Sequence, residues 1–175
     1  MAESRLAQGL AFVALVVVCA TLIAGTAALT RGRIEENRLR QFQRTLTELA
    51  GSARAAADVR WSADDVALLC DGRSLLRGRA AGYGGTIEWI AAADLTGPAP
   101  HLVRLRVTAH QETPGIADFL DRPDSGWLGA LGGSSAAALA TVDTVSGATI
   151  TSRALLRSLS AALQRPALAD PACPA

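Results

Sequence analysis

The feature that most limits what this chain can fold into is a long uncharged apolar segment near its N-terminus. The segment extends from Leu6 to Leu29, and Gln8 is its most polar residue. As an α-helix it would measure ~36 Å at about 1.5 Å per residue, which exceeds the roughly 30 Å of a bilayer's hydrocarbon core. The apolar region of a cleaved signal peptide is shorter, at about 7–15 residues. We therefore predict a retained transmembrane helix over residues 6–30, after an N-terminal tail of residues 1–5.

Outside this segment the composition indicates one small folded domain. Half of the 175 residues are apolar and 19% are charged, a balance that excludes a disordered chain. Three cysteines are too few for a disulfide-dense scaffold, and no two have the close spacing of a metal site. With 17 basic and 16 acidic residues, the net charge of +1 excludes a strongly basic nucleic-acid binder. We expect no metal and no nucleic-acid partner, and whether Cys70 and Cys173 pair stays open.

The residues after the transmembrane segment show first helical and then strand periodicity. Apolar residues recur three and four positions apart within Glu35–Val59, which predicts an amphipathic connecting helix over residues 31–60. Three later segments alternate apolar and polar residues, as strands with one buried face do: Ser74–Ala81, Thr86–Ala93 and Leu102–Ala109. The glycine-rich stretch Gly82–Gly85 between the first two predicts a hairpin turn or a bulge.

The C-terminal half combines a loop with a closing helix. Pro, Gly and Ser are frequent from Thr113 to Ser135, which predicts a long loop with one helical turn near Ala117–Leu120. Leucines on one side of Ser152–Gln164 predict the final helix. We expect one domain over residues 61–165 and a flexible tail over 166–175. The predicted fold class is α/β, in the α+β sense: a transmembrane helix, then a small domain whose mixed or antiparallel sheet is flanked by helices.

The first candidate binding segment follows the last predicted strand and starts at His110. Thr113-Pro114-Gly115-Ile116 fits a type II turn, because Pro fixes φ at the second position and Gly allows a positive φ at the third. Such a turn would present Glu112 and Thr113 at the strand end, with bare backbone at Gly115. The alternative is an ordinary connection between a strand and a loop.

The second candidate segment is Asp143–Ser152, a loop of small residues that leads into the final helix. Amide groups and the positive end of the helix dipole favour a phosphate at such a place. Gly147 and Ala148 leave room beside Thr149, whose hydroxyl could bond to a phosphate or be esterified by one. The alternative is that Thr151 or Ser152 caps the helix.

These two segments resemble the paired signatures of covalently flavinylated FMN-binding domains. Asp143-x-x-Ser146-Gly147-Ala148-Thr149 matches the pattern D-x-x-[S/T]-G-A-T, and His110 to Gly115 matches H-x-E-T-P-G upstream of it. With one N-terminal span and this short length, the chain resembles the G subunit of the Rnf electron-transport complex. The C subunit of the sodium-translocating NADH:quinone reductase is similar but usually longer. The resemblance covers about residues 82–163 and the transmembrane segment.

The resemblance implies that FMN is held covalently, through its phosphate, on Thr149. A flavin transferase of the ApbE type would attach it, with FAD as the donor, and Asp143 would belong to the pattern that the transferase recognises. The remaining positions that would surround the flavin are Ser146, Gly147, Ala148, Glu112, Thr113 and Gly115. The aromatic residues Tyr83 and Trp127 would be neighbours of the ring or would pack in the core. Asp118–Ala140 does not align with the family pattern.

The function that the resemblance implies is that of a membrane-anchored electron carrier. It would serve an Rnf-type complex that moves electrons between ferredoxin and NAD and couples this to ion translocation. The predicted span carries no charge for an ion pathway, so pumping would belong to the other membrane subunits, and this chain would supply no catalytic residue. One alternative is a flavinylated subunit of the quinone reductase or of another flavin-based respiratory chain. Another is a structural single-span subunit without flavin.

The family and the charge pattern disagree about the orientation in the membrane. The family implies a bacterial inner-membrane protein with its soluble domain on the periplasmic side. The positive-inside rule favours the opposite, because basic residues gather after the span: Arg31, Arg33, Arg38, Arg40 and Arg44. We expect the periplasmic orientation, since flavin attachment by this route takes place outside the cytoplasmic membrane.

Overall fold

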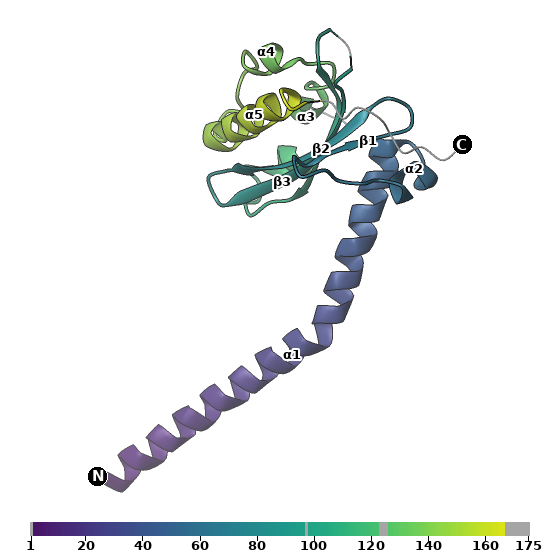
Figure 1. Cartoon of the computed structure of the whole chain (residues 1–175). Helices are drawn as coiled ribbons and strands as arrows, with labels where there is room; N and C mark the ends of the chain where they lie inside the picture. Colours follow the sequence, from purple (N-terminus) through teal and green to yellow (C-terminus); the bar gives the residue numbers. More distant parts are fainter. Residues whose placement is uncertain (1, 97, 123–125, 167–175) are drawn as a thin grey trace. The chain divides into compact units, whose positions relative to one another are not determined.

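The computed structural model describes residues 2–96, 98–122 and 126–166, and it divides into two units, residues 1–42 and 43–175 (Figure 1). The first element, α1 (Ala2–Ala50), contributes to both units. Its segment from Gln8 onward is long and apolar enough to cross a membrane. The side chains from Gln8 to Leu29 are exposed, as expected for a helix that would face lipid. The predicted tail, apart from Pro166, and Cys173 lie outside the described residues.

The second unit is built on a four-stranded antiparallel sheet with the order β1-β2-β3-β4. Its strands are β1 (Val66–Leu68), β2 (Ser74–Ala81), β3 (Thr86–Asp94) and β4 (His101–Ala109). The fold class is therefore confirmed, and the three predicted strands form within one residue of their expected bounds. β1 has three residues, too few for an alternating pattern to stand out. A hairpin joins β2 to β3, where Ala81 pairs with Thr86.

The central strand β3 is buried on both faces, so the prediction of one buried face is wrong for it. Ile87, Trp89, Ala91 and Ala93 face a core that α5 (Thr149–Leu163) closes with its leucines. The alternate residues of β3 face a second core, which the end of α1 covers. Small alanines on β3 allow both layers to approach the sheet closely. Figure 1 shows α5 running along the sheet.

The end of α1 is fixed to this sheet by polar contacts and by a helix stop. α1 ends at Ala50, earlier than predicted, because Gly51 adopts a φ of +80°, which suits glycine at the residue after a helix. The guanidinium of Arg73 donates to the carbonyls of Leu49 and Ala50, each at 3.3 Å. A short helix, α2 (Ala53–Ala57), follows instead of a continued α1.

Three ion pairs strengthen the same region. Glu48 pairs with Arg104 and with the buried Arg106 of β4, so one carboxylate ties α1 to the outer strand. Asp71 pairs with Arg73, which places a charged pair beside the end of α1. Desolvation raises the pKa of Asp71, but hydrogen bonds from Arg73 outweigh it, and the net pKa is lowered.

Between β4 and α5 the described residues form three short helical turns rather than a plain loop. These are η1 (Asp118–Asp121), α3 (Gly126–Gly129) and α4 (Ala136–Leu139). The predicted turn near Ala117–Leu120 corresponds to η1. The turns each bury one leucine, and Leu131 between α3 and α4 is also buried. This segment therefore closes one end of the larger core instead of extending into solvent.

Gly78 in β2 offers a direct test of this packing. A Cβ at this position would overlap the six-membered ring of Trp89, which is 1% exposed and donates through Nε1 to the Ser158 hydroxyl at 3.0 Å. We predict that Gly78→Ala lowers the free energy of unfolding by about 1–3 kcal/mol, since overpacked cores lose roughly that amount. Denaturant unfolding of the full chain in detergent, followed by tryptophan fluorescence, measures it. The control is Gly72→Ala, because a Cβ at this position would meet nothing within 4 Å. Gly72 has a φ of +86°, so any loss of stability in the control measures backbone strain and not overpacking. Unchanged stability of Gly78→Ala would contradict the packing.

Candidate functional site

The buried carboxylate of Glu112 joins three segments that are far apart in the sequence. Its Oε1 accepts hydrogen bonds from the backbone N–H groups of Gly84, at 2.9 Å, and Gly85, at 3.3 Å. Its Oε2 accepts from the hydroxyl of Thr151, at 2.5 Å, and the residue is 8% exposed. Glu112 therefore links the β2–β3 turn, the segment after β4 and the first turn of α5.

The β2–β3 turn is shaped to receive this carboxylate. A Cβ at Gly82 would overlap Oε1 of Glu112, and one at Gly84 or Gly85 would press on Gln111. The backbone closes the turn with a bond from Gly82 N–H to the Gly85 carbonyl at 2.8 Å. The turn was predictable from its glycines, but no local pattern indicates that these glycines serve the contact with Glu112.

The segment around Glu112 forms the predicted turn. Gly115 has a φ of +86°, and the N–H of Ile116 bonds to the carbonyl of Thr113 at 3.3 Å, as in a type II turn. The Asp118 side chain accepts from the Gly115 N–H at 2.6 Å, which holds the turn against η1. Thr113 and Gly115 are both exposed.

The histidine of this segment also has a fixed place. Nε2 of His110 lies 3.2 Å from Oδ1 of Asp121, and Nδ1 lies 3.3 Å from the N–H of Glu112. His110 therefore ties η1 to the residue that joins the three segments. Its role in the described structure is to position Glu112.

The second candidate segment is a tight loop that leads straight into α5. Gly147 has a φ of +81°, and the N–H of Ala148 bonds to the carbonyl of Val145 at 3.0 Å. A Cβ at Gly147 would meet nothing within 4 Å, so the backbone conformation, rather than lack of space, requires glycine. Ala148 is 5% exposed and packs inward, so it is Gly147 that leaves the surface beside Thr149 open.

The alternative that Thr151 or Ser152 caps the final helix is wrong. α5 begins at Thr149, three residues before its predicted start, and its first position is preceded by Ala148 without a side-chain cap. Thr151 bonds to Glu112 instead. The Ser152 hydroxyl is buried, accepts from the Val145 N–H at 3.2 Å and donates to the Ala148 carbonyl at 2.8 Å, so it braces the loop from inside.

Thr149 is therefore an exposed hydroxyl at the start of a long helix. Within the described residues its side chain makes no hydrogen bond, and no side chain accepts from the first N–H groups of α5. Such groups form a favourable place for an anion, because they carry the positive end of the helix dipole. The donor set fits a phosphate esterified to this hydroxyl.

The two aromatic residues considered as ring neighbours lie in different surroundings. Trp127 stacks edge to face on Phe119, with ring centroids 5.3 Å apart, and donates through Nε1 to the Asp143 carbonyl at 2.7 Å. Trp127 thus supports the start of the loop that leads into α5. Tyr83 is 77% exposed at the tip of the β2–β3 turn, beside the glycines that bind Glu112.

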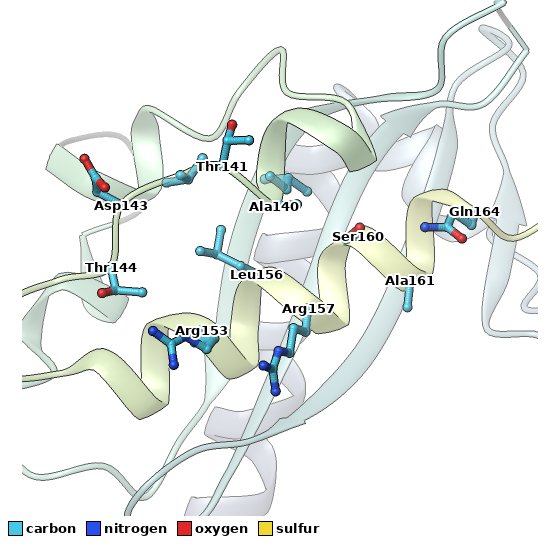
Figure 2. Close-up of a pocket in the computed structure, with 12 residues that line it drawn as sticks. Ala140, Thr141, Asp143, Thr144, Arg153, Leu156, Arg157, Ser160, Ala161 and Gln164 are labelled. Atoms are coloured by element: carbon cyan, nitrogen blue, oxygen red, sulfur yellow. The ribbon is translucent and has the colours of Figure 1, made fainter.

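A groove of about 660 Å³ runs along α5 between Arg153 and Gln164. The segment Leu139–Thr144 forms one wall, and Arg153, Arg157 and Gln164 belong to the α5 wall. Figure 2 shows both guanidinium groups on the same side of α5, with Asp143 on the opposite rim. Sequence reasoning missed these arginines, because nothing in a charge pattern places them beside a groove.

Two family models match the chain in the regions just described. The model of the FMN-binding domain matches residues 82–164, and that of the RnfG N-terminal region matches residues 2–49. In these two regions the chain is similar to Rnf G subunits. The FMN-binding match contains the Glu112 contacts, the loop before α5, and α5 itself.

Individual relatives show the same similarity to Rnf G subunits. The chain is 35% identical over 94 residues to the G subunit of the ion-translocating oxidoreductase complex of Stutzerimonas stutzeri, a match that covers 47% of this chain and 40% of that protein. The protein of the same name from Pseudomonas aeruginosa (strain UCBPP-PA14) is 33% identical over 94 residues, with 47% and 42% covered. The match thus spans about two fifths of the length of these curated relatives.

The contacts of Glu112 can be tested apart from any flavin. We predict that Glu112→Ala speeds hydrogen exchange at Gly84 and Gly85 and costs about 1–3 kcal/mol of stability, because the buried Thr151 hydroxyl and two backbone N–H groups lose their acceptor. Glu112→Gln keeps a carbonyl acceptor and should restore most of the protection. Mass-spectrometric hydrogen exchange of peptides over residues 82–86 measures this. Glu88→Ala removes a more exposed carboxylate from the adjacent strand as the control; equal exchange in both alanine variants would refute the role of Glu112.

Proposed function

We propose that this chain is a membrane-anchored electron carrier that holds FMN covalently on Thr149. The observation that carries the proposal is the exposed, unbonded Thr149 hydroxyl at the uncapped start of α5, inside the segment that matches the FMN-binding domain. The apolar part of α1 would anchor the carrier in a membrane. The relatives are named as subunits of an ion-translocating oxidoreductase complex, which supports a place in a complex of the Rnf type.

The attachment would be a phosphoryl transfer from FAD, performed by a flavin transferase of the ApbE type. The Thr149 oxygen would attack the phosphorus on the FMN side of the diphosphate. A bond forms between this oxygen and phosphorus, the bond from phosphorus to the bridging oxygen breaks, and AMP leaves. The hydroxyl proton passes to a base of the transferase. The acceptor's contribution is to present Thr149 on a rigid loop.

The other predicted site residues divide between the loop and the turn. Ser146, Gly147 and Ala148 would shape the attachment loop, and Asp143 would be read by the transferase. Glu112 would hold the first turn of α5 in place through Thr151, and Thr113 and Gly115 would approach the flavin from the exposed turn. Their support is the hydrogen bond between Glu112 and Thr151, which joins the two motifs.

When bound, FMN would supply the redox chemistry, since a flavin exchanges electrons singly or in pairs. The protein's residues would bind it and keep it at the surface, where a carrier must meet its partners. In an Rnf-type complex the electrons would pass between ferredoxin and NAD, and the other membrane subunits would move the ions. The described part of α1 from Gln8 to Leu29 contains no charged residue that could serve an ion path.

The decisive experiment is flavin fluorescence in a denaturing gel, on full-length protein made with a flavin transferase and FAD. We predict a fluorescent band near 18 kDa that is lost in Thr149→Val, because the variant lacks the hydroxyl that would accept the phosphate. Thr86→Val, at an exposed strand position, is the control and should stay fluorescent. A fluorescent Thr149→Val band would refute the attachment site. A dark wild-type band, with a transferase active on another acceptor, would favour a structural subunit without flavin.

The periplasmic orientation is a separate prediction. An alkaline phosphatase fused after Ala175 should be active, because this enzyme needs an environment outside the cytoplasm to form its disulfides. A green fluorescent protein fused at the same position, exported by the same route, should be dark. The reverse result would show that the arginines after the span set the orientation.

A further inference from the structure

We propose that the groove along α5 is the docking surface for the flavin transferase, with Arg153 and Arg157 binding acidic side chains of that enzyme. The proposal rests on the proposed function, since it concerns how Thr149 is recognised. It assigns recognition by the transferase to residues of α5 that follow Thr149, in addition to the segment that contains Thr149.

The first argument is the position of the two arginines relative to Thr149. They follow it by four and eight residues on one continuous helix, so they lie on the same side of α5, ~6 and ~12 Å from it along the axis. The groove that they line has a volume of about 660 Å³. An enzyme that reaches the Thr149 oxygen in the folded protein therefore meets this groove next to its target.

The second argument is charge. Arg153 and Arg157 are exposed, and within the described residues neither has a hydrogen bond or an ion pair. Most other arginines of the described domain have a partner, such as Arg73, Arg77, Arg79 and Arg106. Two free guanidiniums on one wall match carboxylates of a partner, because a guanidinium binds a carboxylate through two parallel hydrogen bonds.

The third argument comes from the opposite side of α5. There Thr151 bonds to Glu112, and Ser158 donates to the Arg79 carbonyl at 2.9 Å and accepts from Trp89. That side is covered by the sheet, so an approaching enzyme finds access from the groove side. Asp143 and Thr144, the first residues of the attachment segment, line the same groove. The loop and the arginines thus form one continuous surface.

The same charges could also serve an electron-transfer partner of the loaded protein. The observations favour the transferase, because Asp143 and Thr144 of the proposed acceptor segment line the groove, and Arg153 follows Thr149 by about one helical turn. A redox partner would have to approach the flavin ring, and none of the described contacts relates the ring to Arg153 or Arg157.

The test is the rate of flavin incorporation into full-length protein in detergent, measured at varied acceptor concentration with purified transferase and saturating FAD. We expect Arg153→Gln/Arg157→Gln to raise the KM for the acceptor about tenfold and to leave kcat unchanged, since the interaction would be lost equally before and during the reaction. The wild-type KM should rise with salt more steeply than that of the double variant. Ala161→Phe, which fills the groove without changing a charge, should also raise KM.

The matched control is Arg54→Gln, which removes an exposed positive charge from α2, away from the groove. An unchanged KM in the double variant, or a fall in kcat alone, would overturn the proposal. Normal loading kinetics with slower electron transfer from the loaded double variant would overturn it in favour of a redox partner. Absence of flavin from wild type and Arg54→Gln alike would instead refute the proposed function.

Discussion

The carboxylate of Glu112 is the contact on which the arrangement of the site depends. It lies between the β2–β3 turn and the first turn of α5, and it accepts hydrogen bonds from both. Removing it would leave donors from two segments without this acceptor, and for the buried Thr151 hydroxyl the loss costs more than the bond itself stabilises. The start of α5, and hence the position of Thr149, depends on the side chain of Glu112. Glu112 belongs to the other candidate segment, which begins at His110.

Packing on both faces of the sheet holds α5 and Glu112 in this arrangement. Trp89 fills the core under α5, and its indole N–H bonds to Ser158 on the helix. On the other face, the end of α1 packs its leucines against β3 and pairs Glu48 with Arg106. Because the central strand is held on both faces, α5 cannot shift without disturbing a close-packed interior. The exposed groove side of α5 is the part that remains available to a partner.

Local sequence patterns predict much of this fold, but they predict only part of the site. The alternation over Ser74–Ala81 predicted β2, and Pro114-Gly115 predicted the type II turn, because each pattern depends on neighbouring residues. The bond between Glu112 and Thr151 joins residues 39 apart, so no local pattern contains it. The start of α5 was missed for a related reason: Thr151 and Ser152 are good capping residues by type, but each is bonded elsewhere by tertiary structure.

The same distinction explains how a short domain can present an exposed threonine hydroxyl at the start of a helix. A side-chain cap would bond to the first amides of α5 and remove their attraction for a phosphate. Here the candidate cap residues are turned inward: Ser152 braces the loop, and Thr151 reaches Glu112. The positive φ of Gly147 then brings the chain into the helix without a side chain over its end. Among the described residues, the first N–H groups of α5 therefore have no side-chain acceptor. The hydrogen bonds of Thr151 and Ser152 offset the free-energy cost of leaving these groups uncapped.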